Sequence, residues 1–242
     1  MTKRTGYSVY NEDARRRTKQ NTLPDLYPAL PNRRFDIIYA DPPWHYNGKM
    51  QFDKTGKSIE QIDLSKKIFI SSAAFKYPTL KLDDLKAIPV CRIAKDDCLL
   101  FLWTTNPHLA QAVDLGHSWG FEYKTVAFVW DKMNHNPGQY TLSNCELCLL
   151  FKRGRIPKPR GARNIQQLIR TPRSDHSSKP IQVARAIETM FPTQKRIELF
   201  ARRPLKGWTA WGLDFSDAAT PERPLLSQKV TSLLDSLREN RQ

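Results

Sequence analysis

The sequence predicts an α/β fold, an open sheet with helices on both faces. Short apolar segments typical of buried strands alternate with segments of helical periodicity, and no stretch of the chain repeats another. A chain of 242 residues is also long enough to bury a core without disulfide or metal support. Because ligands of such sheets bind beyond the carboxyl ends of the strands, functional residues are expected in the segments that follow strands.

The expected strands are short runs rich in aliphatic and aromatic residues, bounded by polar, proline or glycine residues. They cover residues 35–40, 98–103, 121–130, 145–151, 165–169, 195–201 and 208–212. The first of them, FDIIYA, runs directly into Asp41-Pro42-Pro43, which is typical of a buried parallel strand entering a loop.

Helices are expected at residues 80–88, between Asn106 and Gly120, at 180–190 and at about 224–238. In the second of these, Asn106 is the expected N-cap, a proline follows at the first helical position, and Gly120 ends the helix. The helix at 180–190 is expected because its apolar residues recur at helical spacing.

The chain is expected to divide into three parts. Residues 1–34 are a basic N-terminal arm, residues 35–220 form the folded domain, and residues 221–242 add a C-terminal helix. Within the domain, residues 45–76 lack a convincing period and carry six lysines against three acidic residues. This long exposed loop is either a flap over a bound strand or an insertion without a function of its own.

The charge of the chain predicts a polyanionic partner. Lys and Arg number 39 against 24 Asp and Glu, for a net charge of +15. The stretch from Glu146 to Asp175 holds eight basic residues between those two acids and no acid of its own. Five of these cations are the expected nucleic-acid contacts: Arg153, Arg155, Lys158, Arg160 and Arg163.

Two other classes of protein are excluded or disfavoured by the sequence. No apolar run approaches the roughly 20 residues that a helix needs to span a bilayer. The N-terminal residues contain no apolar stretch of the kind found in secretory signals, so a secreted protein is not expected.

The four cysteines predict core thiols in a reducing compartment rather than a metal site. Cys145 and Cys148 form a C-x-x-C pattern, but they lie in an apolar segment expected to be a strand. Residues three apart on a strand point to opposite faces, and no histidine stands at a zinc spacing. No metal is therefore expected.

Asp41-Pro42-Pro43-Trp44 is the most specific pattern in the chain. The two prolines fix the backbone and remove two N–H donors, so the turn presents the Asp41 carboxylate and the Pro42 carbonyl as acceptors. These acceptors can take the hydrogens of an exocyclic amine, and the Trp44 ring is expected to stack on a planar base. At this turn the sequence resembles the β-class adenine-N6 methyltransferases with the Asp-Pro-Pro-Trp signature. That family includes the catalytic subunit of the mRNA methyltransferase and DNA-methylating enzymes of bacteria and phages.

Further segments resemble the same family in the same order, over about residues 35–215. They are Tyr77-Pro78-Thr79, Phe101-Leu102-Trp103, Cys145-Glu146-Leu147-Cys148-Leu149, His176-Ser177-Ser178-Lys179-Pro180, Ile197-Glu198-Leu199-Phe200-Ala201-Arg202 and Gly207-Trp208-Thr209-Ala210-Trp211-Gly212. The resemblance implies a Rossmann-like methyltransferase sheet in circularly permuted order, with the catalytic turn first and the cofactor segments last.

The resemblance also implies S-adenosylmethionine as the cofactor. The residues expected to contact it are Asp41, Lys179, Phe200, Arg202, Leu213 and Asp214. Near the start of a helix, Lys179 would meet the carboxylate of the methionine moiety. Leu213-Asp214 departs from the Asn-Glu or Asn-Gln of the family: Asp214 can accept ribose hydroxyls, whereas Leu213 cannot.

Together these features predict methylation of the exocyclic N6 amine of adenine in DNA, by a cytoplasmic enzyme of bacterial or phage origin. The expected mechanism is alignment of the amine, with the base flipped out against Trp44 and with neither metal nor covalent intermediate. Two alternatives stay open: an RNA N6-adenosine methyltransferase, and an inactive nucleic-acid-binding partner subunit. A homodimer, or a heterodimer with a related subunit, is also open.

Overall fold

The structure is a computed structural model and describes residues 27–45, 79–136, 140–173 and 178–213. Seven strands form one sheet in these residues: β1 (Phe35–Ala40), β2 (Ala94–Thr104), β3 (Glu122–Asn136), β4 (Ser143–Arg153), β5 (Leu168–Arg170), β6 (Arg196–Leu199) and β7 (Thr209–Trp211). The helices are α4 (Leu82–Ala87), α5 (Leu109–Ser118) and α6 (Ile181–Met190), with short 3₁₀ turns η2 (Val90–Arg92) and η3 (Asn106–His108).

The order of the strands is β5-β3-β4-β2-β1-β6-β7, and the sheet is mixed. Strands β2, β1, β6 and β7 are parallel, so their carboxyl ends lie along one edge, which we call the carboxyl edge. Strand β4 runs antiparallel to β2, which brings the beginning of β4 to the same edge. Loops from four strands therefore meet where α/β sheets bind ligands.

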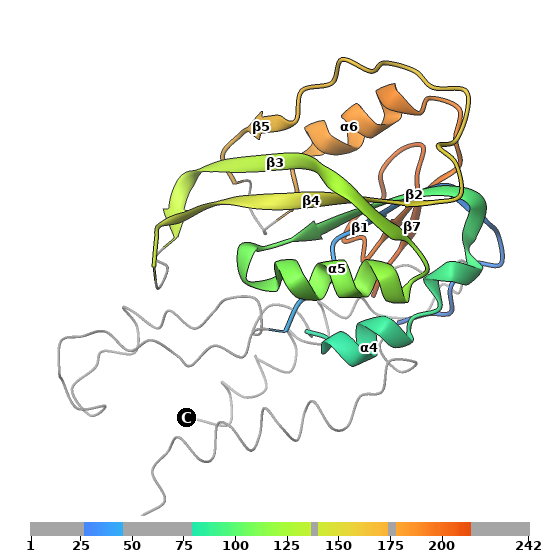
Figure 1. The fold of residues 1–242 in the computed structure, drawn as a ribbon, viewed down its shortest axis with the longest axis horizontal. Coiled ribbons are helices and arrows are strands. Elements are labelled where there is room, and N and C mark those ends of the chain that lie inside the picture. Colours follow the sequence, from blue (N-terminus) through green and yellow to red (C-terminus); the bar gives the residue numbers. More distant parts are fainter. Residues whose placement is uncertain (1–26, 46–78, 137–139, 174–177, 214–242) are drawn as a thin grey trace, which may run out of the picture.

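Helices cover both faces of the sheet, as expected: α4 and α5 lie on one face and α6 lies on the other (Figure 1). Each layer encloses its own core. Ile38, Leu100 and Trp119 are buried on the α4–α5 face, and Ile37, Phe101 and Ile187 are buried on the α6 face. Alternate residues of β1 thus serve opposite cores, as the two-residue period of a strand requires.

The end of the N-terminal arm packs onto this domain. Tyr27 is 6% exposed, and its ring stacks on Trp211 with 5.1 Å between centroids. Trp211 Nε1 donates a hydrogen bond to the carbonyl of Pro28 at 3.0 Å. The domain therefore begins before residue 35, while residues 1–26 and the expected helix at about 224–238 lie outside the described residues.

The strand positions are confirmed, with shifts of a few residues at their ends, but the expectation for Asn106 was wrong. Residues 106–108 form a 3₁₀ turn whose N-cap is Thr105, and the α-helix begins only at Leu109. Thr105, rather than Asn106, has the extended backbone of a cap (φ −96°, ψ 159°), so Asn106 is already the first residue of the turn. No helix in the described part of the chain is long and apolar enough to cross a membrane.

Candidate active site

The Asp41 turn leaves β1 at the carboxyl edge and is held by backbone hydrogen bonds. Asp41 N–H donates to the Leu199 carbonyl of β6 at 3.5 Å, and Leu80 N–H donates to the Pro43 carbonyl at 2.9 Å. The Pro42 carbonyl accepts the N–H of Trp44 at 2.9 Å. Since a carbonyl oxygen has two lone pairs, one acceptor position on Pro42 remains for a substrate.

The structure contradicts the expectation that Trp44 is a stacking wall for a base. The side chain is 6% exposed and belongs to the core. Its Nε1 donates to the Trp103 carbonyl at 3.2 Å, and its ring stacks on His108 with 5.4 Å between centroids. Trp44 therefore supports the turn, because the side chain is buried, the His108 ring stacks on it and its Nε1 already has an acceptor.

A chain of buried charges connects Asp41 to the β3–β4 hairpin. Lys179 Nζ lies 2.7 Å from Asp41 Oδ1 and 3.2 Å from Glu146 Oε2. Lys132 Nζ lies 3.4 Å from Glu146 Oε1, and its side chain is only 4% exposed. Negative and positive groups thus alternate in the order Asp41, Lys179, Glu146, Lys132, so each buried charge has an opposite neighbour.

Within this chain the charged forms of Lys179 and Glu146 are stabilised by their neighbours. Burial alone would lower the pKa of Lys179, but the carboxylates of Asp41 and Glu146 outweigh it and raise that pKa above its usual value. Burial opposes ionisation of Glu146, yet the ammonium groups of Lys179 and Lys132 hold its pKa below the usual value. The partners of Lys179 in the structure are carboxylates of the protein, and its expected contact with a cofactor carboxylate stays a prediction.

A cavity of about 460 Å³ opens beside Asp41 and Lys179, between the carboxyl edge and the start of α6. Its other lining residues include Glu198 and Gln182, the cations Arg202 and Arg203, and the apolar side chains Tyr39, Trp130, Phe200 and Leu205. Arg203 Nη2 donates to Ser178 Oγ at 2.9 Å, which fixes one of the cations in the wall. Its volume is in the range of small-molecule sites.

Glu198 is the acidic group of this cavity that sequence reasoning missed as a functional residue. Burial, together with the negative charge of Asp41, raises the pKa of Glu198 to about 7, while Arg203 opposes the shift. A carboxyl group held in this way favours a cationic ligand, because a nearby positive charge would relieve the unfavourable ionisation.

The other residues expected to contact the cofactor are not all found at the cavity. Phe200 and Arg202 line the cavity, and Phe200 adopts a left-handed backbone conformation with φ 63° that turns the chain sharply after β6. Leu213 packs against the hydrophobic core of the α4–α5 face and is not among the cavity's lining residues. Asp214 lies outside the described residues, so its expected contact with ribose hydroxyls stays a prediction.

Three of the five expected nucleic-acid contacts lie at the opposite edge of the sheet, which we call the amino edge. Arg153 pairs in register with Cys98, roughly 17 Å back along β2 from the level of Asp41. Arg153 Nη1 donates to the Cys91 carbonyl at 3.0 Å, and Arg155 Nε lies 3.5 Å from Asp97. The guanidinium of Arg160 stacks over Phe191 at 5.7 Å. Of the five, Arg155, Lys158 and Arg163 are exposed, and Arg155 is the one of these three that pairs with Asp97.

The turn at the amino edge requires glycine at position 154. Gly154 has φ +60°, and a Cβ there would come within 2.2 Å of the Asp96 carbonyl. Only glycine accepts both the left-handed backbone and this close approach. The basic segment thus begins with a tight turn docked on the start of β2, remote from the cavity.

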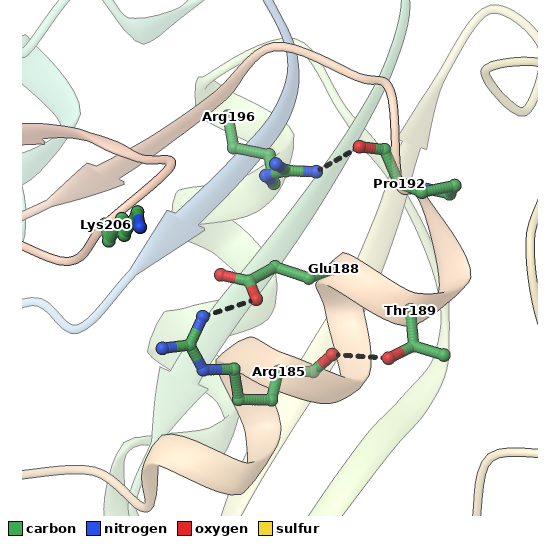
Figure 2. Close-up of a pocket in the computed structure, with 6 residues that line it drawn as sticks. All are labelled: Arg185, Glu188, Thr189, Pro192, Arg196 and Lys206. Atoms are coloured by element: carbon green, nitrogen blue, oxygen red, sulfur yellow. Dashed lines mark hydrogen bonds and ion pairs between the residues drawn. The ribbon is translucent and has the colours of Figure 1, made fainter.

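A second hollow lies on the amino-edge side of α6, lined by Arg185, Glu188, Thr189, Pro192, Arg196 and Lys206 (Figure 2). Three of its charged residues already have partners within the protein. Arg185 Nη1 lies 2.7 Å from Glu188 Oε2, and Glu188 Oε1 accepts from Trp208 Nε1 at 2.7 Å. Arg196 Nη1 donates to the Phe191 carbonyl at 2.6 Å. These contacts fasten α6 to β6 and β7.

The cysteines are all unbonded, but they are not all core residues. Cys98 and Cys148 are buried, Cys145 is half-buried and Cys91 is exposed. Cys148 belongs to the core of the α6 face, whereas Cys145 accepts a hydrogen bond from Asn106 Nδ2 at 3.8 Å.

Comparison with known proteins shows the family of the chain. The profile of the MT-A70 family matches residues 35–214, which is most of the chain. The chain belongs to the MT-A70 family. As a member of this family it is a methyltransferase with a Rossmann-like sheet, and it uses S-adenosylmethionine.

The relatives within the MT-A70 family differ in length. The type II methyltransferase M.MunI of Mycoplasma sp is 55% identical over 213 residues, covering 88% of this chain and 91% of that protein. Human N(6)-adenine-specific methyltransferase METTL4 is 25% identical over 77% of this chain but 39% of its own length. The human N(6)-adenosine-methyltransferase catalytic subunit METTL3 is 24% identical over 70% of this chain and 26% of its own length.

The cavity of this MT-A70 member suits S-adenosylmethionine chemically. The cofactor carries an ammonium, a carboxylate, a sulfonium and a nucleoside. The wall offers the carboxylates of Asp41 and Glu198, the cations Arg202 and Arg203, and the aromatic ring of Phe200. A zwitterion with an attached ring system therefore finds groups of opposite charge and an apolar surface in one cavity.

Proposed function

We propose that this MT-A70 methyltransferase modifies the N6 amine of adenine at specific sites in DNA, in the bacterial cytoplasm, as the modifying partner of restriction. The observation that carries the proposal is Asp41, which ends a parallel strand, lines the cofactor-sized cavity and is paired with Lys179 at 2.7 Å. The 55% identity to a type II methyltransferase supports a site-specific enzyme acting on DNA.

In this proposal Asp41 and the Pro42 carbonyl accept the two hydrogens of the target amine. The Lys179 ammonium lies 2.7 Å from Asp41 Oδ1 and fixes the position of the carboxylate that would accept from the amine. Two fixed acceptors favour the pyramidal amine, whose lone pair is available, over the planar ground state in which that pair is delocalised into the ring. Bound S-adenosylmethionine supplies an electrophilic methyl group on a sulfonium.

The cofactor would be held by residues from both sides of the cavity. We assign Glu198 and Asp41 to its ammonium and Arg202 or Arg203 to its carboxylate, with Phe200 against apolar parts of the ligand. Trp44 supports the Asp41 turn through the Trp103 carbonyl and His108 without touching the base. Catalysis then rests on alignment, since the turn is fixed before substrate arrives.

We further propose that phosphates near the target base are bound by cations close to the carboxyl edge. Arg170 pairs in register with Asp131 of β3, and its side chain is 70% exposed. Arg173, Arg202 and Arg203 lie on the segments that flank the cavity. Of the five expected contacts, Arg153, Arg155 and Arg160 are set aside because they contact groups of the protein at the amino edge. The exposed Lys158 and Arg163 are retained, and they would meet DNA farther from the target.

The test is transfer of label from methyl-labelled S-adenosylmethionine to equal amounts of duplex DNA, single-stranded DNA and RNA. Products are digested to nucleosides, and an Asp41→Ala variant runs in parallel. We expect label in N6-methyldeoxyadenosine with the wild type only. Label in the ribonucleoside would transfer the proposal to RNA, and label in another deoxynucleoside would refute the choice of adenine.

A further inference from the structure

The β3–β4 hairpin extends past the carboxyl edge of the sheet. Strand β4 pairs with β2 only from Leu147 onward, where Leu147 lies opposite Thr104 at the end of β2. Residues 143–146 of β4 therefore continue beyond β2, accompanied by the last residues of β3 (Figure 1). Because Glu146 contacts Lys179 and Lys179 contacts Asp41, the overhanging part starts beside the catalytic turn.

A wide bulge shapes this overhang. The register runs from Asp131 opposite Cys145 to Asn136 opposite Ser143, so five steps on β3 match two on β4. Within the bulge Lys132 is 3% exposed and turns inward to Glu146, whereas the next residue, Met133, is 61% exposed. Met133 has φ 55° and its N–H donates to Asp131 Oδ1 at 3.0 Å. Bulges beside active sites commonly redirect a side chain in this way.

The overhang exposes a group of large apolar side chains. Tyr140 is 91% exposed and Leu142 is 63% exposed, in addition to Met133. One cation stands near Met133, since Arg170 on β5 pairs in register with Asp131 and its Nε lies 3.7 Å from Asp131 Oδ2. Exposed apolar side chains beside a cation complement a duplex whose bases are stacked inside and whose phosphates lie outside.

We propose that Met133, Tyr140 and Leu142 form an apolar wedge that contacts duplex DNA beside the target adenine and occupies space in the stack when that base leaves it. The inference rests on the proposed function. It follows from the position of the wedge, because the target amine must reach Asp41 and the neighbouring base pairs must then lie next to the overhang. Inserted apolar side chains are a known means of holding duplexes unstacked.

The test compares two forms of one substrate. The adenine methylated by the wild type in plasmid DNA is mapped first, and two short duplexes are made around it. In one the target adenine is paired with thymine; in the other it faces an abasic position, so it is already unpaired. Tyr140→Ser/Leu142→Ser is compared with the wild type and with Ile156→Ser, a control that is 41% exposed at the amino edge. Thermal shifts with S-adenosylmethionine report folding and cofactor binding.

For the wedge variant we expect a loss of about tenfold or more in methylation rate on the paired duplex, because nothing then fills the space that the extruded base leaves in the stack. On the abasic duplex the rate should return to within about threefold of the wild type, and Ile156→Ser should match the wild type on both. Equal losses on both duplexes, or no loss on either, would overturn the wedge. If the wedge variant loses activity equally on both duplexes and also changes from a dimer to a monomer, the surface would instead contact a second copy of the chain. A wild type that methylates no adenine in the plasmid would instead refute the proposed function.

Discussion

The two edges of the sheet both gather cations, yet they use them differently. At the carboxyl edge Lys179 and Lys132 are buried between carboxylates and border a cavity. At the amino edge Arg155 is 90% exposed and pairs with a single aspartate. Because the carboxyl-edge charges are buried, removing any one of them should cost stability. Solvent screens the charges at the amino edge, so removing one of those should cost little. A dense run of basic residues in a sequence therefore does not by itself locate the site.

The largest difference between the edges is expected for the paired variants Asp41→Asn and Asp97→Asn. Asp41→Asn replaces a charged acceptor by an amide that can misorient the target amine, and it removes one partner of Lys179. We expect a loss of about a hundred- to a thousandfold in kcat, as for removal of one preorganised group. Asp97→Asn should retain activity. Single-turnover methylation of duplex DNA measures both, and similar losses in the two variants would contradict the account.

A smaller effect is expected on stability from Lys179→Met and Arg155→Met. Removing Lys179 leaves Asp41 and Glu146 close together without their shared cation, and breaking a buried pair costs about 3 kcal/mol or more. The Arg155 variant should lie within about 0.5 kcal/mol of the wild type, since surface changes seldom exceed that. Urea unfolding of both variants provides the comparison; an unaffected Lys179→Met would show that the charge chain is not structural.

The pH dependence of stability should distinguish Glu198 at the cavity from Glu188 at the amino edge. The folded pKa of Glu198, about 7, exceeds its ordinary value of 4.5, so the folded state binds more protons between these values. Stability of the cofactor-free protein should therefore fall as pH rises from 4.5 to 7, and Glu198→Gln should flatten this fall. The pKa of Glu188 is lowered, so its linkage acts only as pH falls below 4.5.

The measurement is Tm for the wild type, Glu198→Gln and Glu188→Gln. It is made at pH 5.5 and at pH 8, on either side of the Glu198 pKa of about 7. Glu188→Gln should keep the slope of the wild type across this window. An unchanged slope in Glu198→Gln would remove the basis for assigning Glu198 to a cationic group of the ligand.

The smallest effect is expected for Trp44→Phe. The change keeps an aromatic ring over His108 but deletes the hydrogen bond to the Trp103 carbonyl. We expect a loss of about 1 kcal/mol in stability with KM for DNA unchanged. A large rise in KM for DNA without loss of stability would restore Trp44 as a surface for the base.

Sequence reasoning identified the strands, the helices on both faces and the Asp41 turn, because apolar periodicity and proline geometry act locally. It missed the pairing of Glu146 with both Lys179 and Lys132. These residues come from β4, β3 and the segment before α6, and no local pattern in the sequence encodes their meeting. The role of Trp44 was misjudged for the same reason. Its neighbours His108 and Trp103 are remote in sequence, so its burial could not be read from the tetrapeptide. A buried glutamate in an otherwise apolar strand was the available signal for Glu146 and Glu198.

The central claim is that the carboxyl edge, rather than the basic amino edge, holds the cofactor. Hydrogen–deuterium exchange of the full chain with and without S-adenosylmethionine tests it most directly. We predict slower exchange in residues 39–41, 178–182 and 198–203 and unchanged exchange in residues 153–163 and 185–196. Protection confined to 153–163 or 185–196 would contradict the account and place the cofactor at the other edge of the sheet.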